Sequence, residues 1–436
     1  MQDMKGFLLR TAAAIVCAAA AIIRLFVSRK GGILLISCQS DEPSQDILDL
    51  EAAIRGTRVT SETTVEQRLP LAACAPCASG ISDIPYVKVM AGRMDRSIGG
   101  AFSFTGKLLS MLKEIAAAKV VVLDAYCPAV SIPGKMDRQK VVQIWHAPEA
   151  IKKFSLQIVD TPAGYDSLTT RILKMHRNYD FILCPSNATL PFFEKAFGYP
   201  ENAFVKYGLP SLDRLGVIKR PERGEPDTPE RVRVKTAIYE KYPDLDASAG
   251  KRPLTIVYAP TFRDGADVDA AGLAHAFEKA MPDAVIVLKL HPLAAAKKAE
   301  FVDINVKEIR QENEPRVITD NKFPLIGWYA AADIVITDYS GAAVEAAAAG
   351  VASYYYIYDI DEYKERRGLN VDLRDEAVGK YAFKDANELA RQALSDFAEE
   401  KGPKYDYGAL SEFADKYLEV PLTGNTQRLA EFLLNC

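Results

Sequence analysis

The sequence predicts an α/β protein with two domains, each built on a parallel sheet. Short runs of β-branched and other apolar residues alternate along the chain with segments of helical character, which is the order of βαβ units. A chain of 436 residues is long for one domain and sufficient for two with appendages. The alternation stops between Ile218 and Pro253, where charge, Pro and Gly dominate, and we expect the two domains to be connected there.

The composition narrows the class of protein. With 49% hydrophobic and 26% charged residues the chain should bury a substantial core. A net charge of −4 gives no reason to expect a nucleic-acid partner. Seven irregularly spaced cysteines fit a reducing compartment. Cys74 and Cys77 form a C-x-x-C, but there is no second pair to complete a zinc site. We therefore expect a reduced pair in a loop and no bound metal, with a redox or metal role as the alternative.

Residues 1–30 predict a membrane-anchor helix. Phe7 to Val27 is apolar except for Arg10, Thr11 and Arg24. The thirteen residues between the two arginines would cover only about 20 Å as a helix, against roughly 30 Å of hydrocarbon. If both arginines snorkel outward, the whole segment is long enough to span. We expect an anchor that spans the membrane or lies in its interface, and the alternatives are a cleaved signal peptide and a buried helix. The cations that follow the segment place the remaining chain in the cytoplasm.

The first domain is expected at residues 31–220. Polar residues and helical patterns at 46–54 and 107–118 separate its strand-like runs, which lie at 33–37, 119–124, 141–144 and 181–184. Residues 221–250 are the expected linker and contain a helix that ends near Tyr242.

The second domain is expected at residues 251–400, with strands at 254–258, 284–290, 317–319, 334–336 and 353–358. Residues 401–436 should form C-terminal helices with a break at 421–424. Thr426 is the expected N-cap of the last helix.

Polar clusters follow four of these strands. His146 lies in the first cluster, Arg263 in the second, Lys289 and His291 in the third, and Ser340 in the fourth. Carboxyl ends of parallel strands meet at one edge of a sheet, where ligands bind. Histidine titrates near neutral pH and suits proton transfer. Either histidine alone could be structural, but the four clusters, split between two domains, indicate a site in a cleft.

The fourth cluster, residues 337–341, has the features of a phosphate-binding turn. It lies between a strand and an Ala-rich helix, whose first N–H groups and positive dipole end favour anions. Thr337 and Ser340 offer hydroxyls, and Gly341 allows close approach of a ligand. An ordinary helix cap is the alternative.

Several motifs resemble those of the CDP-glycerol glycerophosphotransferase family: WHAP at 145–148, YAPTFRD at 258–264, LKLHP at 288–292 and ITDYSGAAVE at 336–345. The segments 184–200, 207–215 and 358–368 resemble the family as well. The resemblance implies a GT-B fold: two Rossmann-like domains facing a cleft, the first binding the acceptor and the second the CDP-linked donor.

The resemblance also implies an activity. A polyol phosphate would pass from CDP-glycerol or CDP-ribitol to a hydroxyl of a lipid-linked acceptor, releasing CMP, with no cofactor. The product would be a teichoic-acid-like cell-surface polymer made at the cytoplasmic face of the membrane. A GT-B glycosyltransferase using a nucleotide sugar, or a non-catalytic membrane-associated relative, is the alternative.

By the same resemblance, His146 is the general base and His291 stabilises the pyrophosphate or the departing CMP. Phosphoryl transfer depends mainly on positioning and charge neutralisation. The donor-binding residues implied are Ala147, Pro148, Ala150, Ser211, Pro260, Thr261, Arg263, Lys289, Thr337, Asp338, Ser340, Gly341 and Glu345.

Three of these positions depart from the family pattern. Ala147 replaces Gly, Ser211 replaces Arg, and Gly341 replaces Ser. The missing Arg would cost a charge-assisted contact worth roughly 1.5–3 kcal/mol. Candidates to replace its charge are Lys152, Lys206 and Arg214.

Overall fold

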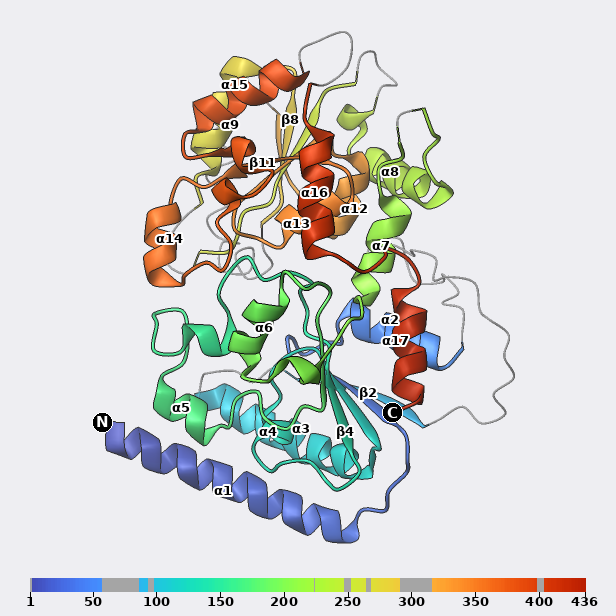
Figure 1. Ribbon diagram of the computed structural model, residues 1–436, viewed down its shortest axis with the longest axis vertical. Helices are drawn as coiled ribbons and strands as arrows, with labels where there is room; N and C mark the ends of the chain where they lie inside the picture. The colour runs from blue at the N-terminus through green and yellow to red at the C-terminus, as the bar shows by residue number, and fades with distance from the viewer. Residues whose placement is uncertain are drawn as a thin grey trace.

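The computed structural model describes residues 2–56, 86–92, 98–222, 224–246, 252–263, 268–290, 316–397 and 404–436. Two lobes lie one above the other, each around its own sheet (Figure 1). We call them the N-terminal lobe, which contains β1 to β6, and the C-terminal lobe, which contains β7 to β12. All strand pairs in both sheets are parallel, so the predicted α/β class with two parallel sheets is confirmed.

The sheet of the N-terminal lobe has the strand order β2-β1-β3-β4-β5-β6. Its strands are β1 (Ile33–Ser37), β2 (Val87–Ala91), β3 (Val120–Leu123), β4 (Lys140–Gln143), β5 (Phe181–Leu183) and β6 (Phe204–Val205). The helices of this part of the chain are α1 (Gln2–Phe26), α2 (Gln45–Ile54), α3 (Ile98–Ala117), α4 (Pro128–Ser131), α5 (Ser167–Ile172), α6 (Leu190–Phe197) and α7 (Pro210–Ile218). Ile36 pairs with Leu123 and Leu123 with Gln143, so these strands end together at the edge that carries the first predicted cluster.

The sheet of the C-terminal lobe has the order β12-β11-β10-β7-β8-β9. Its strands are β7 (Thr255–Tyr258), β8 (Val285–Leu288), β9 (Arg316–Thr319), β10 (Ile334–Thr337), β11 (Ala352–Tyr356) and β12 (Ala382–Phe383). The helices of the C-terminal lobe are α8 (Pro229–Lys241), α9 (Ala270–Ala280), α12 (Leu325–Ala331), α13 (Ala342–Ala348), α14 (Ile360–Arg366), α15 (Ala386–Phe397) and α16 (Tyr407–Tyr417). The last helix, α17 (Asn425–Leu434), returns to the N-terminal lobe.

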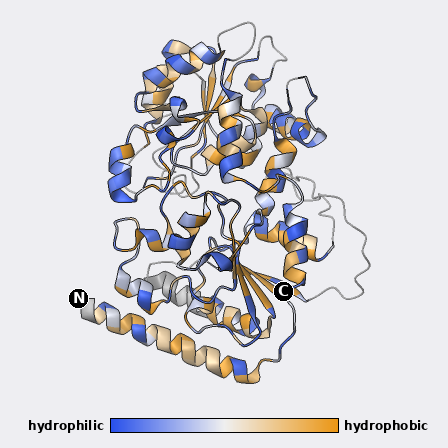
Figure 2. Ribbon diagram, viewed as in Figure 1, coloured by the Kyte–Doolittle hydropathy of each residue, from blue (hydrophilic) through white to orange (hydrophobic). Residues whose placement is uncertain are grey.

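Apolar side chains on both faces of each sheet form the core. In β1, Leu34 and Ile36 belong to one cluster of the N-terminal lobe, whereas Ile33 and Leu35 belong to the cluster on the other face. This alternation follows from the two-residue period of a strand. Because helices cover both faces, the strands are mainly apolar, as Figure 2 shows for the sheet of each lobe.

The chain passes between the lobes twice. The first passage follows α7, and the expected linker includes α8, whose Val234 and Ile238 are buried in the core of the C-terminal lobe. The second passage follows α16 and brings α17 back beside α2 (Figure 1), where Leu429 and Leu433 join the core of the N-terminal lobe. Both connections between the lobes are therefore made by helices that pack in the cores.

The predicted N-cap of the last helix is wrong by two residues. Helix α17 begins at Asn425, with Gly424 as N-cap in the left-handed region (φ 72°). The carboxylate of Asp213 in α7 accepts hydrogen bonds from the backbone N–H groups of Asn425 and Thr426, both at 2.8 Å. A side chain from another helix therefore satisfies the free N–H groups, and Thr426 lies inside the helix.

Candidate active site

His146 follows β4 and projects from a turn with an unusual backbone. Trp145 has φ 59°, in the left-handed region that bulky residues rarely adopt. The side-chain oxygen of Gln143 accepts a hydrogen bond from the N–H of Trp145 at 2.9 Å, which stabilises this turn. The Trp145 ring lies against that of His146, with centroids 4.1 Å apart, and contacts Phe154 and Phe197 on its other sides. The strained turn and the aromatic packing together orient His146.

The hydrogen bonding of His146 fixes its tautomer. Nδ1 lies 3.1 Å from the backbone oxygen of Asp124, the residue that follows β3. A carbonyl oxygen only accepts, so Nδ1 carries the hydrogen and Nε2 is left with its lone pair. His146 is exposed to solvent. Even so, desolvation by the surrounding protein lowers its pKa, and the hydrogen bond to the Asp124 carbonyl opposes this shift. A neutral imidazole with Nε2 unprotonated is the form that acts as a base.

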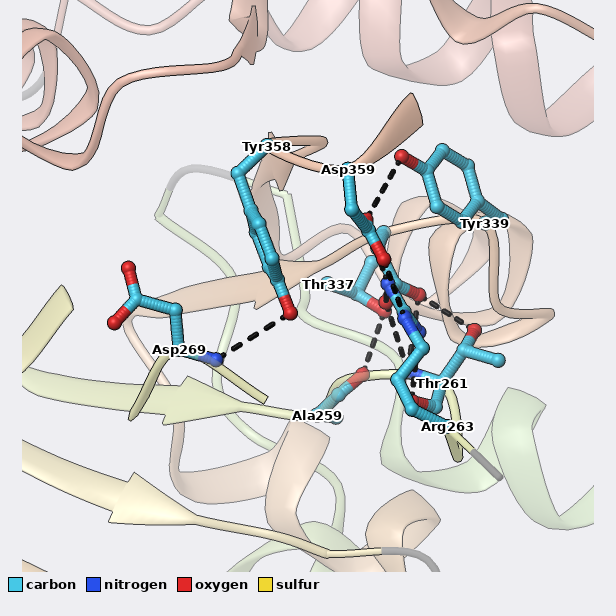
Figure 3. A network of polar contacts seen from close by, with 9 residues as sticks. Ala259, Thr261, Arg263, Asp269, Thr337, Tyr339, Tyr358 and Asp359 are labelled. Carbon is cyan, nitrogen blue, oxygen red and sulfur yellow. Dashed lines mark hydrogen bonds and ion pairs between the residues drawn. The ribbon is translucent and has the colours of Figure 1, made fainter. Parts of the chain in front are cut away.

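The second and fourth clusters are joined by one polar network (Figure 3). Asp338 accepts hydrogen bonds from the N–H (2.9 Å) and hydroxyl (2.6 Å) of Thr261. Arg263 donates to Asp359 through Nε at 2.7 Å and forms an ion pair with Asp338 at 2.9 Å. The Thr337 hydroxyl donates to the backbone oxygen of Ala259, next to the buried Pro260. These contacts fasten the turn after β7 to the turn after β10.

The hydrogen-bonding groups of Arg263 are therefore largely occupied by other residues of the protein. Its guanidinium also donates to the backbone oxygen of Thr261 at 2.7 Å, and the side chain is only 5% exposed. The nearby carboxylates raise its pKa against the opposing effect of burial. Tyr339 donates to Asp359 as well, at 3.2 Å. The predicted residues meet in one place, where they brace the loops around the site.

Lys289, from the third cluster, is also held by the protein. Its Nζ donates to the backbone oxygen of Asp320 at 2.8 Å and to the Asp320 carboxylate at 3.1 Å. The fully buried Asp320 accepts further hydrogen bonds from Trp328 and Tyr242, both at 2.8 Å. This polar core secures the end of β8. His291 and the C-x-x-C of Cys74 and Cys77 lie outside the described residues.

Glu149 belongs to the N-terminal lobe, and its side chain contacts the fourth cluster in the C-terminal lobe. One of its carboxylate oxygens accepts the N–H of Ile151 at 2.9 Å. The other occupies the space that a Cβ at Gly341 would need. A Cβ at position 341 would lie closer to this carboxylate oxygen than van der Waals contact allows, so the Glu149 side chain would have to shift to admit a serine. Ser340, beside it, places its hydroxyl 3.4 Å from the N–H of Ala342 at the start of α13.

Glu345 lies one helical turn into α13 and completes a charged cluster between the lobes. Burial, together with the charge of Glu149, raises its pKa to about 7. Tyr329 donates a hydrogen bond to it at 3.2 Å. Burial lowers the pKa of Lys152, and the charge of Glu149 opposes this shift. We call Glu149, Lys152 and Glu345 the interlobe cluster.

A backbone seam holds the loop after His146 against the C-terminal lobe. The N–H of Lys153 donates to Gly368 at 3.1 Å, and the N–H of Asn370 donates to Ile151 at 2.8 Å. Arg367 donates to the backbone oxygen of Lys153 at 3.0 Å. Glu149 and Asn370 were not predicted as site residues, because only the packing of the two lobes reveals their partners. The motif at 358–368 was the one feature of the sequence that indicated a functional segment here.

The remaining predicted residues lie around this loop and on α7. Ala147, Pro148 and Ala150 form the loop, with Pro148 and Ala150 buried. Ser211 lies, half-buried, in the first turn of α7. Of the candidate replacement cations, Arg214 pairs with Asp46 at 2.7 Å and with Asp49, and Lys206 pairs with Glu419 at 2.6 Å. Lys152 is the candidate that belongs to the interlobe cluster.

Within the described ranges, no group of three or more His, Cys, Asp or Glu side chains is placed to hold a metal ion. The arrangement thus offers a neutral histidine, a cation and two carboxylates at the boundary between two sheets. That set is suited to proton removal from a hydroxyl beside a polar substrate.

The chain is similar to enzymes of teichoic acid synthesis. A teichoic acid ribitol-phosphate primase of Bacillus spizizenii is 26% identical over 352 residues, covering 78% of this chain and 81% of the primase. A teichoic acid glycerol-phosphate primase of Bacillus subtilis is 26% identical over 323 residues, 73% of this chain and 74% of the primase.

The solved structure of the wall teichoic acid polymerase TagF has the same GT-B-like fold, with a TM-score of 0.63 and 16% identity over 100% of this chain and 97% of that chain. The family model described as CDP-Glycerol:Poly(glycerophosphate) glycerophosphotransferase matches residues 86–435. Since that match spans most of the sequence, the chain belongs to the CDP-glycerol:poly(glycerophosphate) glycerophosphotransferase family.

Proposed function

We propose that this protein transfers glycerol phosphate, or another polyol phosphate, from a CDP-linked donor to a hydroxyl of a membrane-linked acceptor, releasing CMP. The reaction would serve the synthesis of a teichoic-acid-like polymer, as the names of the primases similar to this chain suggest. One observation carries the proposal: the Nδ1 of His146 is engaged by the backbone oxygen of Asp124, which leaves Nε2 as the available nitrogen, on a loop that contacts the C-terminal lobe.

In the proposed reaction, Nε2 of His146 takes the proton of the acceptor hydroxyl. The acceptor oxygen then attacks the phosphorus that carries the polyol, and the bond from that phosphorus to the bridging oxygen breaks. CMP leaves with that oxygen, and a new phosphodiester links acceptor and polyol. No covalent enzyme intermediate is needed, because positioning and charge neutralisation dominate phosphoryl transfer.

The interlobe cluster supplies the complementary groups. Lys152 is the cation that we assign to the donor phosphates, in place of the missing arginine at position 211. Ser340 and the N–H groups of the turn add neutral donors. Glu345, with a pKa of about 7, accepts hydrogen bonds from polyol hydroxyls when ionised and donates one when protonated. His291 remains the predicted group that stabilises the leaving CMP.

A donor screen tests this function. Purified protein in detergent would receive CDP-glycerol, CDP-ribitol or a UDP-sugar, each with and without a lipid extract, and nucleotide release would be followed by chromatography. The proposal requires CMP release that depends on the lipid acceptor. Turnover of the UDP-sugar alone would instead establish a glycosyltransferase. Donor binding without turnover on any acceptor would establish a non-catalytic relative.

We place the reaction at the cytoplasmic face of the cell membrane. A lipid-linked acceptor is confined to the bilayer, whereas a CDP-linked donor is water-soluble. Among the residues that the structure describes, one helix, Met4–Phe26, is long and apolar enough to cross a membrane. Membrane lipid and the two substrates are the proposed partners, and a nucleic acid is not among them.

A further inference from the structure

Helix α1 has an inner face of small residues that packs against the N-terminal lobe. Ala20 is 3% exposed and belongs to the core of the lobe, and Val16, Ala19 and Ile23 pack beside it. Gly6 is also buried, and a Cβ there would lie 3.3 Å from Leu168 in α5. Small side chains let the helix backbone approach the lobe closely along this face.

Polar contacts hold α1 at three points along its length. Near its start, Lys5 forms an ion pair with Asp166 at 2.6 Å. In the middle, the Cys17 thiol lies 3.7 Å from the backbone oxygen of Ile132. Near its end, Arg24 donates to the backbone oxygen of Gly134. The helix therefore lies lengthwise across the end of the N-terminal lobe that faces away from the C-terminal lobe (Figure 1).

The outer face of α1 is apolar and uncovered. Eleven large apolar side chains are exposed in the described part of the chain, and seven of them belong to this one helix. Their exposed fractions run from 58% to 81%, and they are Met4, Phe7, Leu8, Ile15, Ile22, Leu25 and Phe26. Their spacings of three, four and seven residues align them in one stripe. Continuous apolar surface of this kind marks a contact with a membrane or another apolar partner.

Charge around the stripe indicates an anionic lipid surface. Lys5 and Arg24 bind the lobe and leave the outer stripe apolar. Arg10 is exposed on the helix, and Arg29 and Lys30 are exposed directly after it. An apolar stripe accompanied by cations is the pattern of a helix lying in the interface of a bilayer that contains anionic lipid.

We propose that α1 lies flat in the membrane interface while it remains docked on the N-terminal lobe. Crossing the bilayer would pull Ala20 and its neighbours out of the core and break the three polar contacts. The length of α1 is sufficient to span a bilayer, but these contacts favour a helix that stays on the lobe. The family model begins at residue 86, so this attachment is a feature of the chain outside the matched region. It rests on the membrane location proposed above, and it is independent of the chemistry at His146.

Vesicle flotation tests the surface. The full-length chain would be mixed with vesicles of phosphatidylcholine alone or of phosphatidylcholine with phosphatidylglycerol, whose negative charge attracts basic segments. The wild type should float with the anionic vesicles, and Phe7→Asp/Ile15→Asp/Leu25→Asp should float at least about tenfold less. The matched control is Val232→Asp/Leu394→Asp, which changes exposed apolar residues elsewhere and should float as the wild type does. Equal flotation of all three proteins would overturn the proposal.

A cross-link distinguishes lying flat from crossing. A zero-length carbodiimide cross-link can join the Lys5 ammonium to the Asp166 carboxylate, which are paired at 2.6 Å and partly exposed, and so lock α1 onto the lobe. The cross-linked protein should float as well as the untreated one, and alkaline carbonate should release both from the vesicles. A cross-link that fails to form in the vesicle-bound protein, together with resistance to carbonate, would show a spanning helix and overturn the proposal.

Two further outcomes are distinguishable. If the triple variant dissociates a dimer in solution but floats normally, the stripe binds a second copy of the chain and the proposal is wrong. CMP release with a detergent-dispersed acceptor should be the same in the wild type and the triple variant, because α1 is remote from His146. Loss of flotation with retained turnover therefore concerns the attachment alone.

Discussion

The carboxylate of Glu149 in the N-terminal lobe occupies the space that a side chain at Gly341 in the C-terminal lobe would need. The close approach links the loop that carries His146 to the turn that begins α13. With glycine at position 341, the Glu149 side chain takes this position without displacement. The two lobes are thus fitted to each other at the site where the proposed chemistry occurs.

Gly341→Ser should weaken the fit between the lobes. The new side chain would overlap the Glu149 carboxylate, and overpacking of this kind costs about 1–3 kcal/mol. We expect a lower melting temperature and a raised KM for the CDP-linked donor. The double variant Gly341→Ser/Glu149→Ala should recover much of the lost stability, because it removes the overlapping atoms. Additive losses in the two single variants and the double variant would refute the coupling.

Glu345 should make stability depend on pH. Its pKa is about 7 in the folded protein, against an ordinary value of 4.5. The folded protein therefore keeps a proton on this carboxyl between these two pH values, where the unfolded chain has lost it. The free energy of unfolding consequently falls as pH rises through this window, and the full penalty is present above pH 7.

Glu345→Gln should remove that penalty. At about 1.4 kcal/mol per pKa unit, urea unfolding at pH 8 should show the variant more stable than the wild type by roughly 1–3 kcal/mol, with little difference near pH 4.5. Glu388→Gln, on the exposed surface of α15, is the matched control and should leave the pH dependence unchanged. An identical pH dependence in Glu345→Gln and the wild type would contradict the prediction.

Trp145 should act as a positioning residue for His146. Activity requires the unprotonated imidazole, so kcat/KM should fall at acid pH with a midpoint below 6.5, since burial lowers the pKa of His146. Trp145→Ala admits water beside the ring and should move that midpoint upward by roughly 0.5–1 pH unit. Phe432→Leu, in an aromatic contact with Tyr207, should lower stability without moving the midpoint. An unshifted midpoint in Trp145→Ala would assign Trp145 a purely structural role.

Asp213 should stabilise the return of the chain to the N-terminal lobe. Asp213→Ala removes the acceptor for two backbone N–H groups of α17 and for the Thr426 hydroxyl. Loss of a helix cap costs about 0.5–2 kcal/mol, and the unpaired buried groups add to it. Urea unfolding should show a larger loss for Asp213→Ala than for Thr426→Val, which removes one hydrogen bond. The opposite order would show that the hydroxyl, and not the cap, dominates.

Strands were predictable from sequence where both faces are buried. Runs such as Ile33–Ser37 are buried throughout and apolar up to Ile36, because helices cover both sides of the sheet. The edge strands β2, β6 and β12 were not predicted: β6 and β12 have two residues each, and all are partly exposed. Their sequences carry little of the apolar pattern on which such predictions depend.

The site was predictable only as far as local sequence reaches. Residues at strand ends predicted a site at the carboxyl edge of each sheet, and the structure brings the second and fourth clusters together there. The partners of Arg263 could not be predicted, since Asp338 and Asp359 reach it only through the fold. The approach of Glu149 to Gly341 depends in addition on how the two lobes pack, which no spacing of residues reveals.

CMP release by His146→Ala is the most direct test of the central claim. The variant, the wild type and His275→Ala would receive CDP-glycerol or CDP-ribitol with a lipid acceptor; His275 lies exposed on α9, where its side chain is 63% exposed. A general base contributes about 10²–10⁴-fold, so His146→Ala should lose at least about 100-fold in kcat at an unchanged melting temperature, and His275→Ala should match the wild type. Full turnover by folded His146→Ala would contradict the account.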